Sequence, residues 1–128
     1  MKKLDFMIVG AQKSGTTALA SFLGEHTNIA ISEPKEVHLF DAEEASFTTN
    51  DIQLTYESAF SHLASSKNML LGEATPIYMY LSGIVQQLKT YNSDLKIIAI
   101  LRNPVERAYS HYCMEKKRGR ENRPFWLA

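Results

Sequence analysis

The sequence predicts an α/β fold in three layers, with helices on both faces of a parallel sheet. Three strongly apolar segments, at residues 6–9, 69–71 and 95–101, have the length of strands, and stretches with helical spacing of apolar residues follow them. Strands that alternate with helices favour a parallel sheet with right-handed crossovers. The chain has 128 residues, 45% of them apolar, and no repeat or linker divides it, so we expect one domain over residues 1–128.

A strand, a loop and a helix follow one another at the start of the chain. Apolar residues 6–9 precede a loop with two glycines, and a helix is expected from Thr16 or Thr17 to about residue 26. Residues 28–31 are expected to form the second strand, which a Ser-Glu-Pro sequence ends. The amides of the loop therefore point toward the start of a helix, which favours the binding of anions.

The middle of the chain is expected to hold an irregular segment, a strand and two helices. Residues 35–41 alternate polar and apolar side chains and are expected to be extended or loop. Asp51 is expected to cap a helix, and residues 68–73 contain the next strand. A further amphipathic helix is expected over residues 79–91, because apolar residues recur there at helical spacing.

Residues 95–101 are the clearest strand. Nearly all of them are apolar or β-branched, which is typical of a strand covered on both faces of a parallel sheet. Pro104 suits the first turn of a helix that continues to about residue 118. In this arrangement Lys13, Glu73 and Arg102 all lie at the carboxyl ends of strands, where ligands of such sheets bind.

The composition excludes several classes of protein. Lysine plus arginine and aspartate plus glutamate each total 14, so no overall field attracts nucleic acid or a membrane surface. The single cysteine, Cys113, cannot form an internal disulfide or a cysteine metal cluster, and it fits a reducing compartment. Asp5 and Gly10 interrupt the first apolar run, and no run approaches the ~20 residues of a membrane helix. We therefore expect a cytoplasmic protein without a metal ion.

The glycine loop, residues 10–17, carries the most informative pattern. It reads Gly-Ala-Gln-Lys-Ser-Gly-Thr-Thr. The loop of a nucleoside triphosphatase has a lysine directly after its last glycine, where it reaches the β and γ phosphates. Here Thr16 follows Gly15, and the cation, Lys13, lies inside the loop. A short anionic group near the 5′ oxygen of a nucleotide fits this position better than a triphosphate does, which makes a small P-loop kinase the less favoured alternative.

A second motif covers residues 101–112, LRNPVERAYSHY. It places Arg102 at the end of a strand and Ser110 about two turns into the following helix. A guanidinium group offers a planar fork to a phosphate, and a serine hydroxyl can add one hydrogen bond. Two anion sites at neighbouring strand ends suit a nucleotide with phosphates on both the 5′ and the 3′ positions of its ribose.

Together, the two motifs resemble those of the sulfotransferases that use 3′-phosphoadenosine 5′-phosphosulfate (PAPS), particularly the heparan-sulfate-type and bacterial members. Residues 35–38 (KEVH) and 72–76 (GEATP) are also similar to segments of that family, so the resemblance covers residues 6 to about 123. It implies a P-loop NTPase-like fold and transfer of the sulfuryl group from PAPS to an acceptor hydroxyl or amine, without a metal. The family's domain is longer, so the chain resembles a truncated, N-terminal portion of it.

The resemblance also implies roles for individual residues. Lys13 is expected to neutralise the charge that develops on the bridging oxygen of the leaving group. Glu36 is expected to be the general base, and His38, with Asp41, is expected to orient Glu36 or the acceptor. The residues expected to bind the donor are Gln12, Lys13, Ser14, Gly15, Thr16, Thr17, Arg102 and Ser110.

Structural alternatives exist for both anion sites. Lys13 could be a solvated loop lysine. Arg102 could pair with Glu106 one turn later, while the Ser110 hydroxyl bonds to the backbone of its own helix.

The acidic residues have structural alternatives as well. Glu36 could be a surface carboxylate paired with Lys35 or Lys13. Glu73 could form an ion pair with Lys13 across the strand ends or contact the acceptor, and we favour the structural role.

The sequence leaves the acceptor open among glycans, lipids and small alcohols or amines. Related glycan-modifying members often carry a lysine where Ala74 stands here. A non-catalytic nucleotide-binding remnant is the alternative to an enzyme. Sheet edge and apolar surface left uncovered by a short domain would favour self-association.

Overall fold

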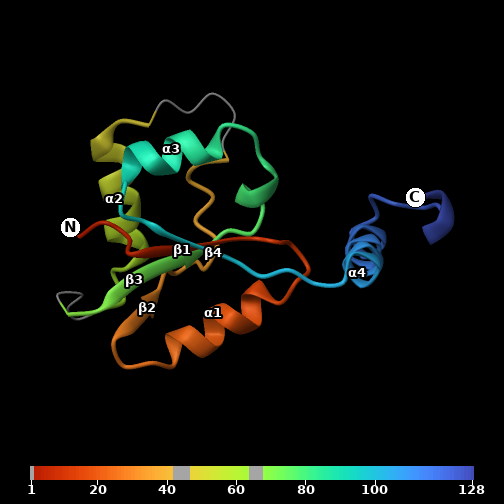
Figure 1. Ribbon diagram of the computed structural model, residues 1–128, viewed down its shortest axis with the longest axis horizontal. Helices are drawn as coiled ribbons and strands as arrows, with labels where there is room; N and C mark the ends of the chain where they lie inside the picture. The colour runs from red at the N-terminus through yellow and green to blue at the C-terminus, as the bar shows by residue number, and fades with distance from the viewer. Residues whose placement is uncertain (1, 42–46, 64–67) are drawn as a thin grey trace.

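The computed structural model describes residues 2–41, 47–63 and 68–128 of the protein. These residues contain a four-stranded sheet in the order β2-β3-β1-β4 (Figure 1). All three pairings in the sheet are parallel. The strands are β1 (Phe6–Gly10), β2 (Ile29–Ile31), β3 (Leu70–Ala74) and β4 (Lys96–Ala99).

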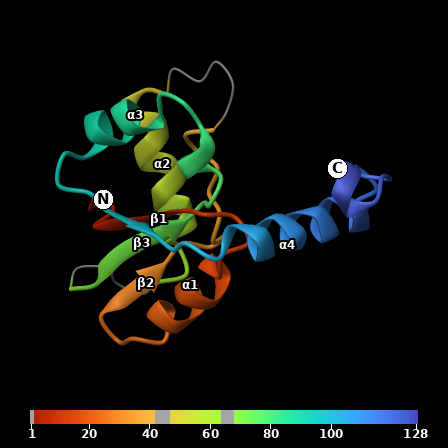
Figure 2. The ribbon, with the colours of Figure 1, turned by 45° about the vertical axis from the view of Figure 1, so that its right-hand side comes forward.

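Helices cover the two faces of the sheet. α1 lies on one face, and α2 and α3 lie together on the other, while α4 extends away from the sheet (Figures 1 and 2). The predicted three-layer α/β fold with a parallel sheet is therefore confirmed. The helices are α1 (Thr16–Gly24), α2 (Thr49–Ala59), α3 (Ile84–Tyr91) and α4 (Pro104–Lys117), and short 3-10 turns span Tyr78–Tyr80 and Phe125–Leu127.

Side-chain alternation along β1 divides the core in two. Phe6 and Ile8 pack with α1, whereas Met7 and Val9 pack on the side of α2 and α3. On the α1 side, Gly72 of β3 lies directly against the Phe6 ring, so any Cβ at this position would collide with the ring. Glycine is therefore required where the two central strands meet.

Two helix starts differ from the sequence predictions. The helix predicted over 79–91 begins only at Ile84, because Gly83 adopts a left-handed conformation with φ 81° and separates α3 from the 3-10 turn before it. Thr48, not Asp51, is the N-cap of α2. The Thr48 Oγ1 accepts from the Asp51 amide at 3.2 Å, and the Asp51 carboxylate accepts from the Thr48 amide at 2.9 Å. The two residues thus form a capping box.

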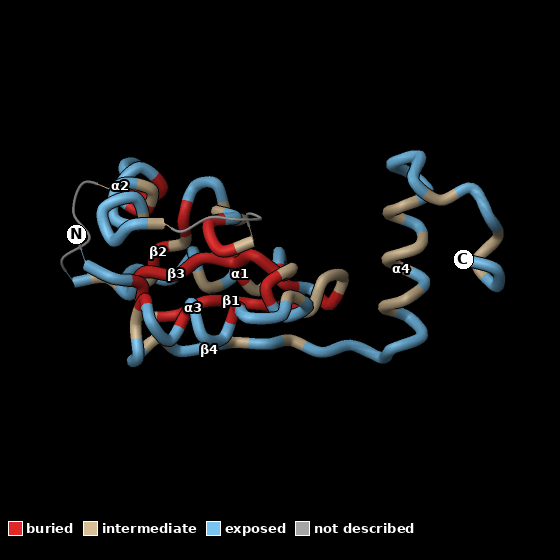
Figure 3. The backbone as a smooth tube through the Cα atoms, turned by 90° about the horizontal axis from the view of Figure 1, so that it is seen from above, coloured by how far each residue is buried: buried red, intermediate tan, exposed pale blue. Residues whose placement is uncertain are grey.

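The prediction that residues 95–101 are covered on both faces is wrong. β4 pairs only with β1 at the edge of the sheet, and 52% of the Ile97 surface and 72% of the Leu101 surface are exposed. The reason is that α4 does not fold back over this face: Figure 3 shows it standing apart from the buried centre, and none of its residues is buried. Among the described residues, no helix or loop covers these exposed apolar side chains.

Candidate active site

The glycine loop joins β1 to α1 with two residues in the left-handed conformation. Lys13 has φ 65°, and Gly15, the N-cap of α1, has φ 96°. No side chain caps the start of α1, so the first amides of the helix lack an acceptor inside it. Such amides, at the positive end of a helix, are suited to hold an anion.

The side chains of the loop are also available to a ligand. Ser14 is buried, and its Oγ has no hydrogen-bond partner, although a buried hydroxyl without a partner destabilises the fold. Thr16 is buried too, while Thr17 is exposed and Gln12 is partly exposed. In the part of the chain that the structure describes, the Lys13 ammonium forms neither an ion pair nor a hydrogen bond. The loop therefore presents a free cation and a free hydroxyl.

Arg102 brings the second motif to the glycine loop. Its Nη1 donates to the Lys13 carbonyl oxygen at 3.4 Å, across 89 positions of sequence. Its Nε also donates to Glu106 Oε2 at 3.1 Å, so the ion pair that was the structural alternative is present. The other part of that alternative is not: among the described residues the Ser110 hydroxyl bonds to nothing, including the backbone of α4.

Glu36, His38 and Asp41 form a chain of ionisable groups. Glu36 Oε2 lies 3.3 Å from His38 Nε2, and His38 Nδ1 lies 2.6 Å from Asp41 Oδ2. His38 reaches both carboxylates from a left-handed backbone conformation, with φ 56°. Glu36 Oε1 also accepts from Lys35 Nζ at 2.8 Å, so the predicted surface ion pair exists beside the chain. His38 thus contacts Glu36 directly and Asp41 contacts His38, while the expected role of the two residues in orienting Glu36 or the acceptor stays a prediction.

The segment that carries these groups is fastened to the end of β3. The Ala74 amide donates to the Lys35 carbonyl oxygen at 3.0 Å, and the Phe40 amide donates to the Tyr78 hydroxyl at 3.2 Å. Tyr78 was not among the site residues expected from the sequence. Its position four residues after Ala74, just beyond a strand end, was the signal that could have identified it.

Glu73 does not pair with Lys13, and that sequence expectation is wrong. It shares the face of β3 that Leu71 presents to α2 and α3, because side chains alternate along a strand. It is fully buried, and neither carboxylate oxygen has a hydrogen-bond partner. Burial raises the pKa of Glu73 to about 8, against the opposing effect of the Tyr78 and Tyr56 hydroxyls.

A pocket of about 550 Å³ opens beside the glycine loop. Arg107 and His111, one turn apart on α4, line it together with the exposed ring of Tyr80. Within the described residues the Arg107 guanidinium has no partner, and the His111 Nδ1 is buried without one. Neither residue was among the site residues expected from the sequence, although their spacing of four residues on a helix was visible.

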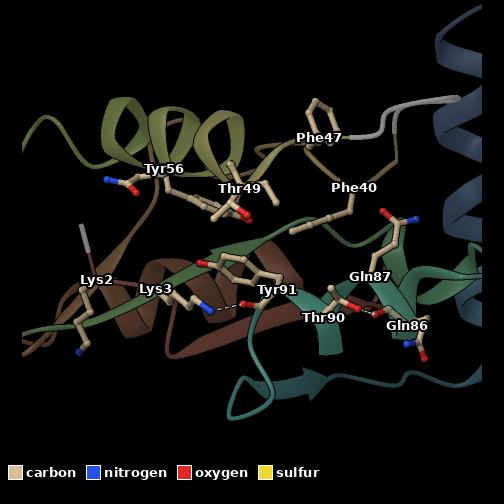
Figure 4. Close-up of a pocket in the computed structure, with 12 residues that line it drawn as sticks. Lys2, Lys3, Phe40, Phe47, Thr49, Tyr56, Gln86, Gln87, Thr90 and Tyr91 are labelled. Atoms are coloured by element: carbon tan, nitrogen blue, oxygen red, sulfur yellow. Dashed lines mark hydrogen bonds between the residues drawn. The ribbon is translucent and has the colours of Figure 1, made fainter.

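A second pocket, of about 440 Å³, lies between α2 and α3 (Figure 4). Tyr56, Tyr91 and Phe40 contribute to its wall, and Lys3 lies at its edge. None of its lining residues belongs to the glycine loop or to α4. This pocket is therefore separate from the glycine loop and from the pocket beside it.

Residues 2–41, 47–63 and 68–128 contain no group of three histidine, cysteine, aspartate or glutamate side chains placed to hold a metal ion. None of the helices in these ranges combines the length and the hydrophobicity that crossing a membrane requires.

Comparisons with known proteins identify the family of this chain. A family model for the sulfotransferase domain matches residues 3–124, and the chain therefore belongs to the sulfotransferase family. A solved structure of a sulfotransferase from Alicyclobacillus acidocaldarius is similar, with a TM-score of 0.80 and 28% sequence identity over 99% of this chain. The resemblance inferred from the sequence is thus confirmed.

Curated proteins that are similar to this chain are also sulfotransferases. The chain is 38% identical to the membrane-associated sulfotransferase kil1 of Dictyostelium discoideum over 84% of its length. It is 32% identical to human heparan sulfate glucosamine 3-O-sulfotransferase 6 over 83% of its length. The chain spans only 22% of the first of these relatives, 29% of the second, and 56% of the solved bacterial chain.

Proposed function

We propose that this protein transfers the sulfuryl group of PAPS to an acceptor hydroxyl or amine. One observation carries the proposal: the hydrogen bond from Arg102 to the Lys13 carbonyl oxygen, which joins two anion-binding motifs at neighbouring strand ends. A donor with one anionic group on each side of its ribose is suited to such a pair of sites. Membership of the sulfotransferase family supports the same reaction.

The proposed donor sites use groups from both motifs. The amides at the start of α1, with the hydroxyls of Ser14, Thr16 and Thr17, would hold the 5′-phosphosulfate. Arg102 and Ser110 would hold the 3′-phosphate, with the guanidinium turning from Glu106 to the more strongly charged phosphate.

The proposed reaction is a direct displacement at sulfur. A bond forms between sulfur and the acceptor oxygen or nitrogen while the bond from sulfur to the bridging oxygen breaks, leaving 3′-phosphoadenosine 5′-phosphate. Glu36 takes the acceptor proton, held in place by His38, which contacts it on one side and Asp41 on the other. The Lys13 ammonium, free of other partners, neutralises the negative charge that develops on the leaving oxygen. The reaction as written needs no metal.

We place the acceptor in the pocket of about 550 Å³ beside the glycine loop. Its unpaired Arg107 favours an acceptor that carries an anionic group near the hydroxyl or amine, and its exposed Tyr80 ring offers an apolar face. Glycans, lipids and small alcohols or amines with such a group all remain candidates. The heparan sulfate enzymes among the relatives make glycans the first to test.

A non-catalytic nucleotide-binding protein is the second candidate. Two pairings favour it, because Glu106 already neutralises Arg102 and Lys35 already neutralises Glu36. In a catalytic protein both pairs must open or shift when the substrates bind.

Transfer of radiolabelled sulfate from PAPS to a panel of glycans, lipids, alcohols and amines tests the proposal, with calorimetry of PAPS binding in parallel. We expect a labelled acceptor and PAPS binding that does not require magnesium. PAPS binding with no labelled product for any acceptor would favour the second candidate. Magnesium-dependent ATP turnover without PAPS binding would exclude both candidates and favour the small P-loop kinase instead.

A further inference from the structure

Glu73 is a buried ionisable residue that the proposed reaction does not use. It lies on β3 under α2 and α3 with 0% of its surface exposed. The rings of Tyr56 from α2 and Tyr91 from α3 lie above this face of the sheet, 5.7 Å apart between their centres (Figure 4). Tyr78 completes the surroundings from the 3-10 turn that follows β3.

The surroundings of Glu73 favour its neutral form. The ionisable groups that face it are the phenols of Tyr56, Tyr78 and Tyr91 and the carboxylate of Asp41. No described cation pairs with it: the Lys3 ammonium instead donates to the Tyr91 carbonyl oxygen at 2.7 Å and lies 5.7 Å from the centre of that ring. Desolvation therefore dominates and raises the pKa of Glu73 to about 8. At neutral pH most molecules carry a proton on this carboxyl group.

Two contacts connect Glu73 to the segment 35–41. The Tyr78 hydroxyl, which lies close enough to the Glu73 carboxyl group to lower its pKa, accepts the Phe40 amide at 3.2 Å. The second contact is electrostatic, because the carboxylates of Asp41 and Glu73 repel one another when both are ionised. Asp41 in turn holds His38 at 2.6 Å. A charge on Glu73 therefore acts on the segment at two adjacent residues, Phe40 and Asp41, close to His38.

We propose that neutral Glu73 is a positioning residue for sulfuryl transfer, which acts through Tyr78 and Asp41 to hold Glu36 and His38 in place. The proposal rests on the proposed function only for its effect on rate. When Glu73 loses its proton, its charge draws the Tyr78 hydroxyl toward itself and repels Asp41. The Phe40 amide then loses its acceptor, and the segment 35–41 loosens from the end of β3.

The variant Glu73→Gln tests the proposal, because glutamine has nearly the same shape and stays neutral at every pH. Nuclear magnetic resonance would follow the Phe40 amide and the His38 ring from pH 6 to about pH 10 in the full chain. In the wild type we expect both signals to show a transition near pH 8, and in Glu73→Gln we expect neither to show it. Glu25→Gln, which changes an exposed glutamate after α1, is the matched control and should keep the transition.

The rate of transfer provides the second measurement. Above pH 8 the wild-type rate should fall up to tenfold per pH unit relative to Glu73→Gln, because only the protonated form positions the base. Tyr78→Phe should lower the rate at every pH and remove the transition from the Phe40 amide. A rate profile identical in wild type and Glu73→Gln would overturn the positioning role.

The two measurements separate this inference from the proposed function. If no acceptor is sulfated but the transition near pH 8 depends on Glu73, the proposed function fails and the coupling stands. If sulfate is transferred but the transition persists in Glu73→Gln, the positioning role fails alone. Should Glu73→Gln not fold, the carboxyl carbon shift of Glu73 in the labelled wild-type chain decides: a midpoint in the ordinary range of glutamate contradicts the proposal.

Discussion

Lys13 is the residue whose chemistry differs most from that of a nucleoside triphosphatase loop. Its ammonium has no partner among the described residues, and its backbone adopts the left-handed conformation inside the glycine loop. If it neutralises the leaving oxygen, Lys13→Ala should lower kcat about 10²–10³-fold while changing KM for the acceptor little. Sulfate-transfer kinetics measure this, and Lys89→Ala, an exposed lysine on α3, is the control. Equal kcat in the two variants would remove Lys13 from the reaction.

Arg102 should contribute to donor binding rather than to the chemical step. We expect Arg102→Ala to weaken PAPS binding about 10–100-fold, as is usual when a charged hydrogen-bonding partner is lost. The same variant should bind adenosine 5′-phosphosulfate, which lacks the 3′-phosphate, as weakly as the wild type does. Calorimetry with both donors measures this difference. Glu106→Gln, which releases the guanidinium from its ion pair, should tighten PAPS binding; a weaker affinity would show that the pair supports the site.

Glu73 should make the stability of the fold depend on pH. Its pKa is raised from 4.5 to about 8 on folding, so the folded chain binds one more proton than the unfolded chain between these values. The contribution of Glu73 to the free energy of unfolding should therefore be highest below about pH 4.5. It should fall as the pH rises to about 8 and stay level above that pH. The full loss is at most about 5 kcal/mol. Urea unfolding of wild type and Glu73→Gln at several pH values measures it, and parallel curves for the two proteins would contradict the assignment.

At the scale of single elements, α4 depends on its own local signals. None of its residues is buried, so packing contributes little to holding it helical. Asn103 accepts from the Val105 amide at 3.0 Å and the Glu106 amide at 3.3 Å, and Pro104 occupies the first turn. Asn103→Ala should therefore destabilise the helix by about 1 kcal/mol and speed hydrogen exchange of its amides, with Asn122→Ala as the control. Because Ser110 lies on this helix, PAPS binding should weaken as well.

The elements that the sequence predicted well are those specified by neighbouring residues. β1, the glycine loop and the start of α1 follow from an apolar run, two glycines and threonines, and α4 follows from Asn103-Pro104. The start of α3 was misplaced because the helical spacing of apolar residues continues on both sides of Gly83. The left-handed backbone of Gly83 interrupts the helix, and the spacing alone does not reveal this interruption.

The site was predictable to the extent that strand ends determine it. The meeting of Lys13 with Arg102 followed from the parallel sheet, because carboxyl ends of neighbouring strands share an edge. The environment of Glu73 did not follow in the same way. Alternation along β3 places it on the face of Leu71, but the tyrosines above it come from α2 and α3, whose packing no local pattern encodes. Long-range contacts of this kind decide whether a carboxyl group is a surface ion pair or a buried acid.

At the scale of the whole molecule, the uncovered side of the sheet is the dominant feature. β4 is an edge strand. Ile97 within it and Leu101 and Val105 after it expose 52%, 72% and 68% of their surfaces. An edge that combines free backbone groups with apolar side chains favours pairing with another chain. We expect the purified chain to self-associate at high concentration, and Ile97→Lys with Leu101→Lys to shift it toward the monomer, because charges on an edge oppose such pairing. Sedimentation equilibrium over a hundredfold range of concentration measures this, and Phe22→Lys, at an exposed position on α1, is the control. A wild-type chain that stays monomeric throughout, or a double variant that associates as strongly as Phe22→Lys does, would show that this face is not the site of association.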